Sequence, residues 1–336
     1  MNRGHAILRE KSTVHDDTLP TGFDLAAYWA DVRPRPLETW LPALRVIRGR
    51  HGLPDGPWHR FRRGRNVVVG LGEGSVVKLT PPFWRGDTER ETAALGWLGR
   101  RLPVAVPTVV ATGAIGEWTY GVQRRLPGTP LTDLWPDLGL ADRVRLARHH
   151  GEIMAALHAL PLDAVPDEVG FDWPRMLREQ WAECEDQMRA AGVPDALLAT
   201  LPAELAAARP LIEAPGPNVL LHGDLTGLNL LVEDIDGAPA ITGLVDWGDA
   251  KVGPPAHDMI SPGVHQYRAE REPLRAFWSG YGLPEPDRPR FAREVMARAM
   301  VFYPDTFDHY IRDVPEAERG SWSAVARAFW HLDDDR

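Results

Sequence analysis

The chain has 336 residues, of which 44% are hydrophobic and 25% charged, and its formal net charge is −9. This length and composition indicate one large globular domain or two lobes, and the acidic balance argues against nucleic acid as a partner. A single cysteine, Cys184, excludes a disulfide within the chain. Without an apolar signal segment or a run near the ~20 apolar residues of a membrane span, we expect a cytoplasmic protein without a membrane partner.

Helical periodicity marks the beginning of the chain, after a polar arm over residues 1–20. Segments 24–32 and 36–53 have the spacing of amphipathic helices. In the second segment the apolar residues that share one face are Leu37, Trp40, Leu41, Leu44 and Ile47. Gly52 and Pro54 are expected to end this helix, because glycine caps a C-terminus and proline cannot continue it.

The period changes to that of strands between residues 56 and 80. Runs 66–71 and 75–79 are short and β-branched, so they predict a hairpin whose Gly-Glu-Gly connection is a turn. A dinucleotide-binding fingerprint is not indicated, because a strand rather than a helix follows these glycines. A helix over 87–102 and two strands within 106–126 complete this part of the chain.

After the Pro-Gly-Thr-Pro stretch at 127–130 the chain becomes mainly helical. The segments with helical periods are 140–160, 174–190, 196–209, 270–281, 289–303 and 320–331. Strand-like apolar runs lie between 217 and 247. His149 and His150, in the first helix, are expected at the surface because no metal-ligand spacing surrounds them.

This order of elements predicts an α+β chain in three parts. We expect an N-terminal arm with helices over 1–54, a small β-rich lobe over 55–126, and a larger, mainly helical lobe over 127–336.

A polar motif, HGDLTGLN over 222–229, stands between two apolar runs, and Asp246 follows 22 residues after Asp224. Any one of these Asp or Asn residues alone is a common turn former. Together, their oxygens are the ligands that Mg²⁺ prefers, and a carboxylate that is not on the metal can accept a proton. The order of Asp, Asn, and Asp before Gly is that of phosphoryl transfer by kinases. We therefore predict Asp224 as the catalytic base and Asn229 and Asp246 as metal ligands.

Such a site also needs a cation for the nucleotide phosphates. Lys78 lies in the apolar strand SVVKL. It is either a charged residue that protects a sheet edge from pairing with another strand, or a ligand of the phosphates. Glu91 shares a helix face with three apolar residues, so we expect it to point inward, where an acid needs a partner. Glu89 is expected to be exposed. Thr88 and Glu91 also fit a capping box, but Lys78 at the right point in the chain favours an ion pair.

The motifs NVVVGLGEGSVVKL, HGDLTGLNLLV and GLVDWGDAKVGPPAHD resemble those of the aminoglycoside phosphotransferases and their choline-kinase-like relatives. The resemblance extends from about residue 57 to about residue 310. The layout, with its helical, Trp-containing beginning, is most similar to the hygromycin B phosphotransferases. This resemblance implies a bilobal protein-kinase-like fold, and an enzyme that uses Mg²⁺ and ATP or GTP to phosphorylate a hydroxyl group of a small molecule.

The resemblance implies further roles around the nucleotide. Lys78 would hold the α and β phosphates, with Glu91 positioning it. The loop over 63–66, with Gly64 and Asn66, would cover the phosphates. The carbonyl of Arg124 and the amide of Leu126 would bind the base edge. Gln123 would stand at the gate of the base pocket, where the family often has an apolar residue, and this leaves ATP and GTP both open.

In the larger lobe, the resemblance implies that His222 and Asp258 brace the catalytic loop. A cationic, amine-bearing acceptor needs acids, and the helical part offers Asp305, Asp308, Glu183, Glu185 and Asp186. A solvated helix surface is the alternative for either group. The function expected first is the modification of an aminoglycoside such as hygromycin B. A metabolic kinase for an amino alcohol, sugar or amino acid is the second candidate. An inactive, kinase-like binding protein is disfavoured by the intact set of site residues.

Overall fold

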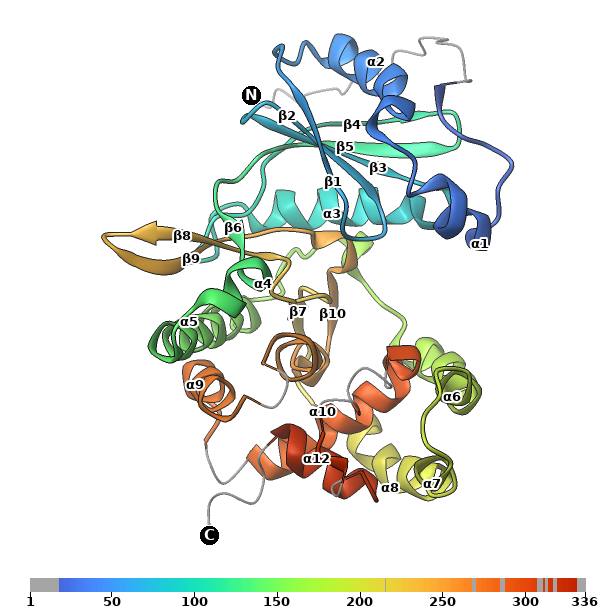
Figure 1. Ribbon diagram of the computed structural model, residues 1–336, viewed down its shortest axis with the longest axis vertical. Coiled ribbons are helices and arrows are strands. Elements are labelled where there is room, and N and C mark those ends of the chain that lie inside the picture. The colour runs from blue at the N-terminus through green and yellow to red at the C-terminus, as the bar shows by residue number, and fades with distance from the viewer. Residues whose placement is uncertain are drawn as a thin grey trace. The chain divides into compact units, whose positions relative to one another are not determined.

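The computed structural model describes residues 18–214, 216–267, 270–284, 288–306, 311, 314–316 and 319–330 (Figure 1). The chain divides into two compact units. The first is Met1–Thr88 with Val109–Arg125, and the second is Glu89–Thr108 with Leu126–Arg336. One unit carries a five-stranded sheet and the other is mainly helical, as the α+β prediction requires. Among the described residues, every helix is too short or too polar to cross a membrane.

The first unit is built on an antiparallel sheet with the strand order β1-β2-β3-β5-β4. Its strands are β1 Trp58–Phe61, β2 Val67–Leu71, β3 Ser75–Thr80, β4 Val109–Ile115 and β5 Trp118–Arg124. The predicted hairpin is confirmed, because Leu71 lies opposite Ser75 across the Gly-Glu-Gly turn. Gly72 in this turn has a φ of +54°, a conformation that side chains other than glycine rarely adopt.

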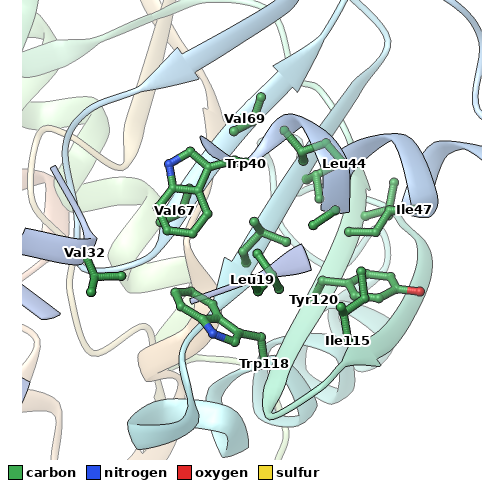
Figure 2. Close-up of a cluster of buried hydrophobic side chains, with 14 of the residues drawn as sticks. Leu19, Val32, Trp40, Leu44, Ile47, Val67, Val69, Ile115, Trp118 and Tyr120 are labelled. Carbon is green, nitrogen blue, oxygen red and sulfur yellow. The ribbon is translucent and has the colours of Figure 1, made fainter. Parts of the chain in front are cut away.

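Helices at the beginning of the chain cover one face of this sheet. The first predicted helix is a short α1, Leu25–Ala27, followed by a π-helical turn over Tyr28–Val32. The second is a 3₁₀ turn, Leu37–Thr39, followed by α2, Leu41–His51, which ends at Gly52 as predicted. Trp40, Leu44 and Ile47 are fully buried in the cluster of strand side chains in Figure 2, which includes Val67, Val69 and Tyr120.

The second unit contains most of the helices. Its helices are α4 Leu131–Leu134, α5 Leu140–His158, α6 Trp173–Ala190, α7 Asp195–Leu198, α8 Leu201–Glu213, α9 Arg271–Tyr281, α10 Arg288–Phe302 and α12 Trp322–Trp330. Helix α3, Arg85–Leu98, begins in the first unit and continues into the second. The helix predicted over 196–209 is two helices, and Pro202 lies in the first turn of the second one, where its missing N–H leaves no bond unmade.

Short strands in the second unit frame the polar motif. Strand β7, Val219–Leu221, pairs with β10, Lys251–Gly253, and β8, Leu230–Ile235, pairs with both β6, Thr129–Pro130, and β9, Ala238–Leu244. The chain between β7 and β8 is therefore a loop over 222–229 with a fixed strand at each end.

The expectation that His150 lies at the surface is wrong. His150 is fully buried in α5, and its Nδ1 lies 2.9 Å from the hydroxyl of Tyr267. The ring also packs against Phe277 of α9, with 5.1 Å between the ring centroids. Helix α9 and the π-helical turn Pro262–Tyr267 cover this face of α5, and the local sequence of α5 does not reveal that cover.

Candidate functional site

The loop between β7 and β8 closes onto Asp224. The Nδ2 group of Asn229 donates to the carbonyl oxygen of Asp224 at 2.7 Å and to its Oδ2 at 3.0 Å. The backbone N–H of Thr226 donates to the same carbonyl at 2.9 Å. Asn229 is buried, with 6% exposure. The predicted base and one predicted metal ligand are therefore in direct contact within one loop.

Asp258 holds the beginning of this loop. Its Oδ2 accepts the N–H of His222 and its Oδ1 accepts the N–H of Gly223, each at 2.8 Å. His158, at the end of α5, lies with its Nε2 3.3 Å from the same Oδ2. Burial by itself would raise the pKa of Asp258, but the hydrogen bond and the charge of His158, together with His222 and the Gly223 N–H, hold that pKa below its ordinary value.

His222 links the loop to the strand that precedes Asp246. Its Nε2 lies 3.0 Å from the carbonyl oxygen of Val245, which can only accept, so Nε2 carries the proton. Its Nδ1 then accepts the backbone N–H of Asp224 at 3.3 Å. The ring packs against that of Trp247, with centroids 4.5 Å apart. Both ring nitrogens therefore orient the backbone on either side of the site.

The environment of Asp224 raises its pKa to about 6. Burial is the largest cause, and the negative charge of Asp246 is the next. The proximity of His222 and the hydrogen bond from Asn229 oppose this rise, while Asp249 adds to it. Asp224 and Asp246 are thus close enough for their charges to interact.

Asp246 lies in an unusual backbone conformation two residues after the end of β9. Its φ of 66° and ψ of 65° belong to the left-handed region, which costs free energy for a residue other than glycine. Neighbouring residues hold it there, because the N–H of Val245 donates to the carbonyl of Asn229 at 3.0 Å. The N–H of Trp247 donates to Oε1 of Glu91 at 3.1 Å. Strain of this kind is common at functional sites.

Helix α3 supports the same segment. Glu91 is buried, with 4% exposure, as predicted, whereas Glu89 is exposed. The capping-box alternative is excluded because α3 begins at Arg85, so Thr88 is not its N-cap. The Thr88 hydroxyl instead lies 3.1 Å from that of Thr80 and 2.9 Å from that of Thr119.

Lys78 lies in the centre of the sheet of the first unit. Strand β3 runs between β2 and β5, and Lys78 is opposite Val68 on one side and Gly121 on the other. The alternative of a residue that protects a sheet edge is therefore excluded. Because Val77 and Leu79 face the helix-covered side of the sheet, Lys78, with 7% exposure, projects from the other side.

The remaining nucleotide candidates lie at two ends of this sheet. Gly64, with a φ of +81°, and Asn66, with 5% exposure, belong to the connection between β1 and β2. Arg124 is the last residue of β5 and pairs with Ser75. Leu126 is the first residue of the following segment of the second unit. The pairing of Lys78 with Glu91 stays a prediction.

Asp305 is the acceptor candidate with a near neighbour in contact with the catalytic loop. It is exposed in the 3₁₀ turn Pro304–Thr306, and the preceding Tyr303 places its hydroxyl 3.5 Å from the carbonyl of Gly223. Asp308 lies outside the described residues.

The other acidic candidates lie on α6. Glu183 accepts a hydrogen bond from Gln187 at 3.0 Å, and Glu185 forms an ion pair with Arg189 at 3.0 Å. Glu185 also lines a cavity of about 410 Å³ between α6 and α8. Asp186 is exposed. Local partners thus already satisfy two of these three acids.

Sequence patterns did not identify His158 or Tyr281, whose hydroxyl lies 3.0 Å from Nδ1 of His158. Neither residue belongs to a motif. They act on the loop only through Asp258, because α5 and α9 pack together and bring Tyr281 to His158 and His158 to Asp258. The only signal in the sequence was a His at the end of an amphipathic helix.

Residues 62–292 of the chain match a family described as the phosphotransferase enzyme family. Viomycin phosphotransferase of Streptomyces vinaceus is 31% identical over 216 residues, which are 62% of this chain and 71% of that protein. An aminoglycoside 3'-phosphotransferase of Streptomyces ribosidificus is 27% identical over 269 residues, 76% of this chain and 95% of that protein.

Solved structures of related proteins have the same fold. The GDP complex of aminoglycoside 2'-phosphotransferase-IIIa superposes with a TM-score of 0.66 at 17% identity, over 87% of this chain and 97% of that one. Macrolide 2'-phosphotransferase of Brachybacterium faecium gives 0.53 at 25% identity, over 88% and 99%. The predicted protein-kinase-like fold is therefore confirmed.

Proposed function

The chain belongs to the phosphotransferase enzyme family, and from this premise we propose that it transfers the γ-phosphoryl group of ATP or GTP to a hydroxyl group of a small antibiotic. The observation that carries the proposal is the half-buried Asp224, held by Asn229 in a loop braced by Asp258. A base fixed in this way supplies the positioning and the proton acceptor that phosphoryl transfer needs.

Asp224 accepts the proton of the acceptor hydroxyl in this proposal. One carboxylate oxygen is held by Asn229, so the other is the atom that can face the acceptor. As the proton moves to Asp224, the hydroxyl oxygen bonds to the γ phosphorus, and the bond from that phosphorus to the leaving diphosphate oxygen breaks. The raised pKa of Asp224 makes it a better proton acceptor than an exposed aspartate.

Asn229 and Asp246 fit a Mg²⁺ ion. Both Asn229–Asp224 hydrogen bonds use the Nδ2 group of Asn229, so its Oδ1 is the hard oxygen that would serve as a ligand together with the carboxylate of Asp246. The ion would neutralise phosphate charge as it develops. Lys78, the 63–66 loop with Gly64 and Asn66, and the backbone of Arg124 and Leu126 are proposed to hold the nucleotide.

An antibiotic acceptor is supported by the names of the relatives, which are viomycin, aminoglycoside and macrolide phosphotransferases. The net charge of −9 and the exposed Asp305 beyond Tyr303 favour an amine-bearing acceptor among them. Hygromycin B stays an expectation that rests on the layout of the N-terminal helices. A cytoplasmic location stays a proposal as well.

The test is a turnover assay with ATP and with GTP against a panel of acceptors. The panel contains aminoglycosides with hygromycin B, viomycin, a macrolide, choline, sugars and amino acids. We expect a product that carries one added phosphoryl group from at least one antibiotic. Turnover with the metabolites alone would assign a metabolic kinase instead, and nucleotide binding without turnover of any acceptor would indicate an inactive binding protein.

Asp224→Asn is the control variant within this assay. We expect it to lower transfer at least roughly a hundredfold, the low end of general-base effects, while Mg-nucleotide still binds. Asp195→Asn, at an exposed position in α7, provides the matched substitution and should keep wild-type turnover. Near-normal turnover in Asp224→Asn would remove Asp224 from the role of base.

A further inference from the structure

The connection between β1 and β2 is rich in arginine and is held at both ends. It runs from Arg62 to Asn66, and its first three residues are exposed. A kinase loop over phosphates is usually rich in glycine, whereas this one has a single glycine, Gly64. Its conformation therefore depends on contacts with other parts of the first unit, and the helical residues at the beginning of the chain supply them.

Tyr28 and two other side chains fix the C-terminal end of the loop at Arg65. The hydroxyl of the fully buried Tyr28 donates to the carbonyl oxygen of Arg65 at 2.5 Å. The guanidinium of Arg65 forms an ion pair with Asp87 at 2.6 Å and lies over the ring of Trp84, 5.5 Å from its centroid. The backbone and the side chain of this one residue are thus both held.

Arg33 fixes the N-terminal end of the loop. Its Nη2 donates to the carbonyl oxygen of Arg62 at 2.6 Å. Arg60, on the adjoining strand, donates in return to the carbonyls of Arg33 and Arg35. Residues 28–35 therefore contact both ends of the loop, and only Arg63 and Gly64 lie between the two held carbonyls.

Tyr28 stays a donor at any physiological pH. Burial raises its pKa to about 12, although the nearby cations Arg33, Arg60 and Arg65 act in the opposite direction. The hydroxyl of Tyr28 reaches the carbonyl of Arg65 only while the 28–32 turn is packed on the sheet. Its ring lies 6.1 Å from that of Trp118 and 5.6 Å from that of Trp84, between centroids.

We propose that residues 28–35 are a clamp that orders the 62–66 loop for the nucleotide phosphates, with Tyr28 and Arg33 as its positioning residues. This inference rests on the proposed function, which places the phosphates under the loop. A loop that is ordered before binding does not lose backbone entropy when the anion binds. A glycine-rich loop becomes ordered when the ligand binds, whereas the clamp orders this loop beforehand. The N-terminal segment thereby has a role in nucleotide binding.

The first experiment measures steady-state kinetics of Tyr28→Phe. Phenylalanine keeps the ring in its aromatic surroundings and removes the hydroxyl that holds Arg65. We expect the nucleotide KM to rise about 3- to 10-fold, the range that one buried hydrogen bond supports, while kcat and the acceptor KM change less than twofold. Arg33→Met should act in the same direction from the other end of the loop.

Tyr120→Phe is the matched control. Tyr120 is a buried tyrosine in β5 of the same unit, but its hydroxyl bonds to Arg50 at 3.0 Å and His51 at 2.9 Å in α2 and not to the loop. We expect it to lower the thermal stability about as much as Tyr28→Phe without changing the nucleotide KM. An equal rise of that KM in both variants would overturn the clamp, because it would show a general loosening of the sheet.

A second experiment examines the loop without any nucleotide. Trypsin cleaves after arginine, and Arg62 and Arg63 are both exposed in the loop. We expect Tyr28→Phe and Arg33→Met to speed cleavage after Arg62 and Arg63 at least threefold relative to wild type and to Tyr120→Phe, measured by mass spectrometry at early times. Cleavage at the wild-type rate in both variants would overturn the clamp.

ATP or GTP with Mg²⁺ is then added to the wild-type protein in the same digestion. Protection of the loop supports its place over the phosphates. A different result would be faster cleavage in the two variants, but no protection by nucleotide and no measurable nucleotide binding. This would support the contact of residues 28–35 with the loop. It would overturn both the proposed function and the nucleotide role of the clamp. The failure of the contact and the failure of the function are therefore separate results.

Discussion

Glu91 has two roles that variants can distinguish: its hydrogen bond with Trp247 and its predicted pairing with Lys78. Its buried Oε1 accepts the N–H of Trp247, next to Asp246. Glu91→Ala leaves that buried N–H without an acceptor, so we expect the free energy of unfolding to fall by about 1–3 kcal/mol. Glu91→Gln keeps an acceptor oxygen and removes the negative charge that the predicted pairing with Lys78 needs.

Denaturant unfolding and kinetics of the two Glu91 variants, with Lys78→Met beside them, distinguish these roles. We expect Glu91→Gln to keep most of the stability and to raise the nucleotide KM or lower kcat as Lys78→Met does, with a double variant far from additive. If Glu91→Gln has wild-type kinetics, the predicted pairing is wrong and the role of Glu91 is to hold Trp247.

His257 makes the stability of the protein depend on pH. It is 3% exposed, and neither ring nitrogen has a hydrogen-bond partner among the described residues. Its pKa is lowered to about 3, with burial as the largest cause; Lys251 and Arg298 act in the same direction, and Asp258 partly opposes them. The unfolded chain binds this proton near pH 6.5, so between pH 6.5 and 3 the unfolded state holds more protons, and stability falls as the pH falls.

We therefore expect His257→Leu to be less sensitive to acid than the wild-type protein. At pH 5 one such histidine lowers the free energy of unfolding by about 2 kcal/mol relative to neutral pH. The free energy of unfolding in urea, measured at pH 7 and pH 5, should fall less in the variant by roughly that amount. His150 has a similarly lowered pKa and retains its own contribution. Identical pH dependence in variant and wild type would contradict the assignment.

At the scale of elements, α5 and α9 approach each other closely through glycine. A Cβ added to Gly151 would lie 2.2 Å from the carbonyl oxygen of Phe277, and one added to Gly280 would lie 2.0 Å from that of Arg148. Both atoms belong to helix backbones, so they cannot avoid the added Cβ by a side-chain rotation. The close approach also joins His158 of α5 to Tyr281 of α9, beneath Asp258 and the catalytic loop.

Gly151→Ala should therefore destabilise the protein, although alanine is the better helix former. We expect a loss of about 1–3 kcal/mol or more in thermal unfolding, because the two helices must separate, together with lower activity from a displaced His158. Gly96→Ala in α3 is the control, since its Cβ meets nothing within 4 Å. That variant should gain up to about 1 kcal/mol. A stabilising effect at both positions would show that the helix pair can relax freely.

At the scale of the whole molecule, the net charge of −9 favours a cationic acceptor. The screening length falls from about 10 Å at 0.1 M salt to about 3 Å at 1 M. We expect the acceptor KM to rise with salt more than the nucleotide KM, and Asp305→Asn to raise the acceptor KM while kcat stays nearly unchanged. Asp195→Asn is the exposed control. If the acceptor is neutral, the charge argument is wrong. If the acceptor is an amine with a KM that Asp305→Asn does not change, the acidic residues of α6 become the next candidates for the acceptor pocket.

Features that depend on neighbours along the chain could be predicted from the amino-acid sequence. The change of hydrophobic period separated strands from helices, and the glycines marked the hairpin turn. Asn229 and Asp224 are only five residues apart, so the motif placed both in one loop, where the structure shows them in contact. Burial of Glu91 followed in the same way from the apolar residues on its helix face.

Contacts that join distant segments became known only from the folded structure. Asp258 lies 36 residues from His222, Glu91 lies 156 from Trp247, and Tyr28 lies 37 from Arg65. The folded structure also decided that Lys78 lies in a central strand and that His150 is buried. Apolar burial is non-directional, so a periodic pattern indicates which face of an element is covered without indicating what covers it. The partners of a buried polar group are set by the elements that pack on it, and for this protein those lie far away along the chain.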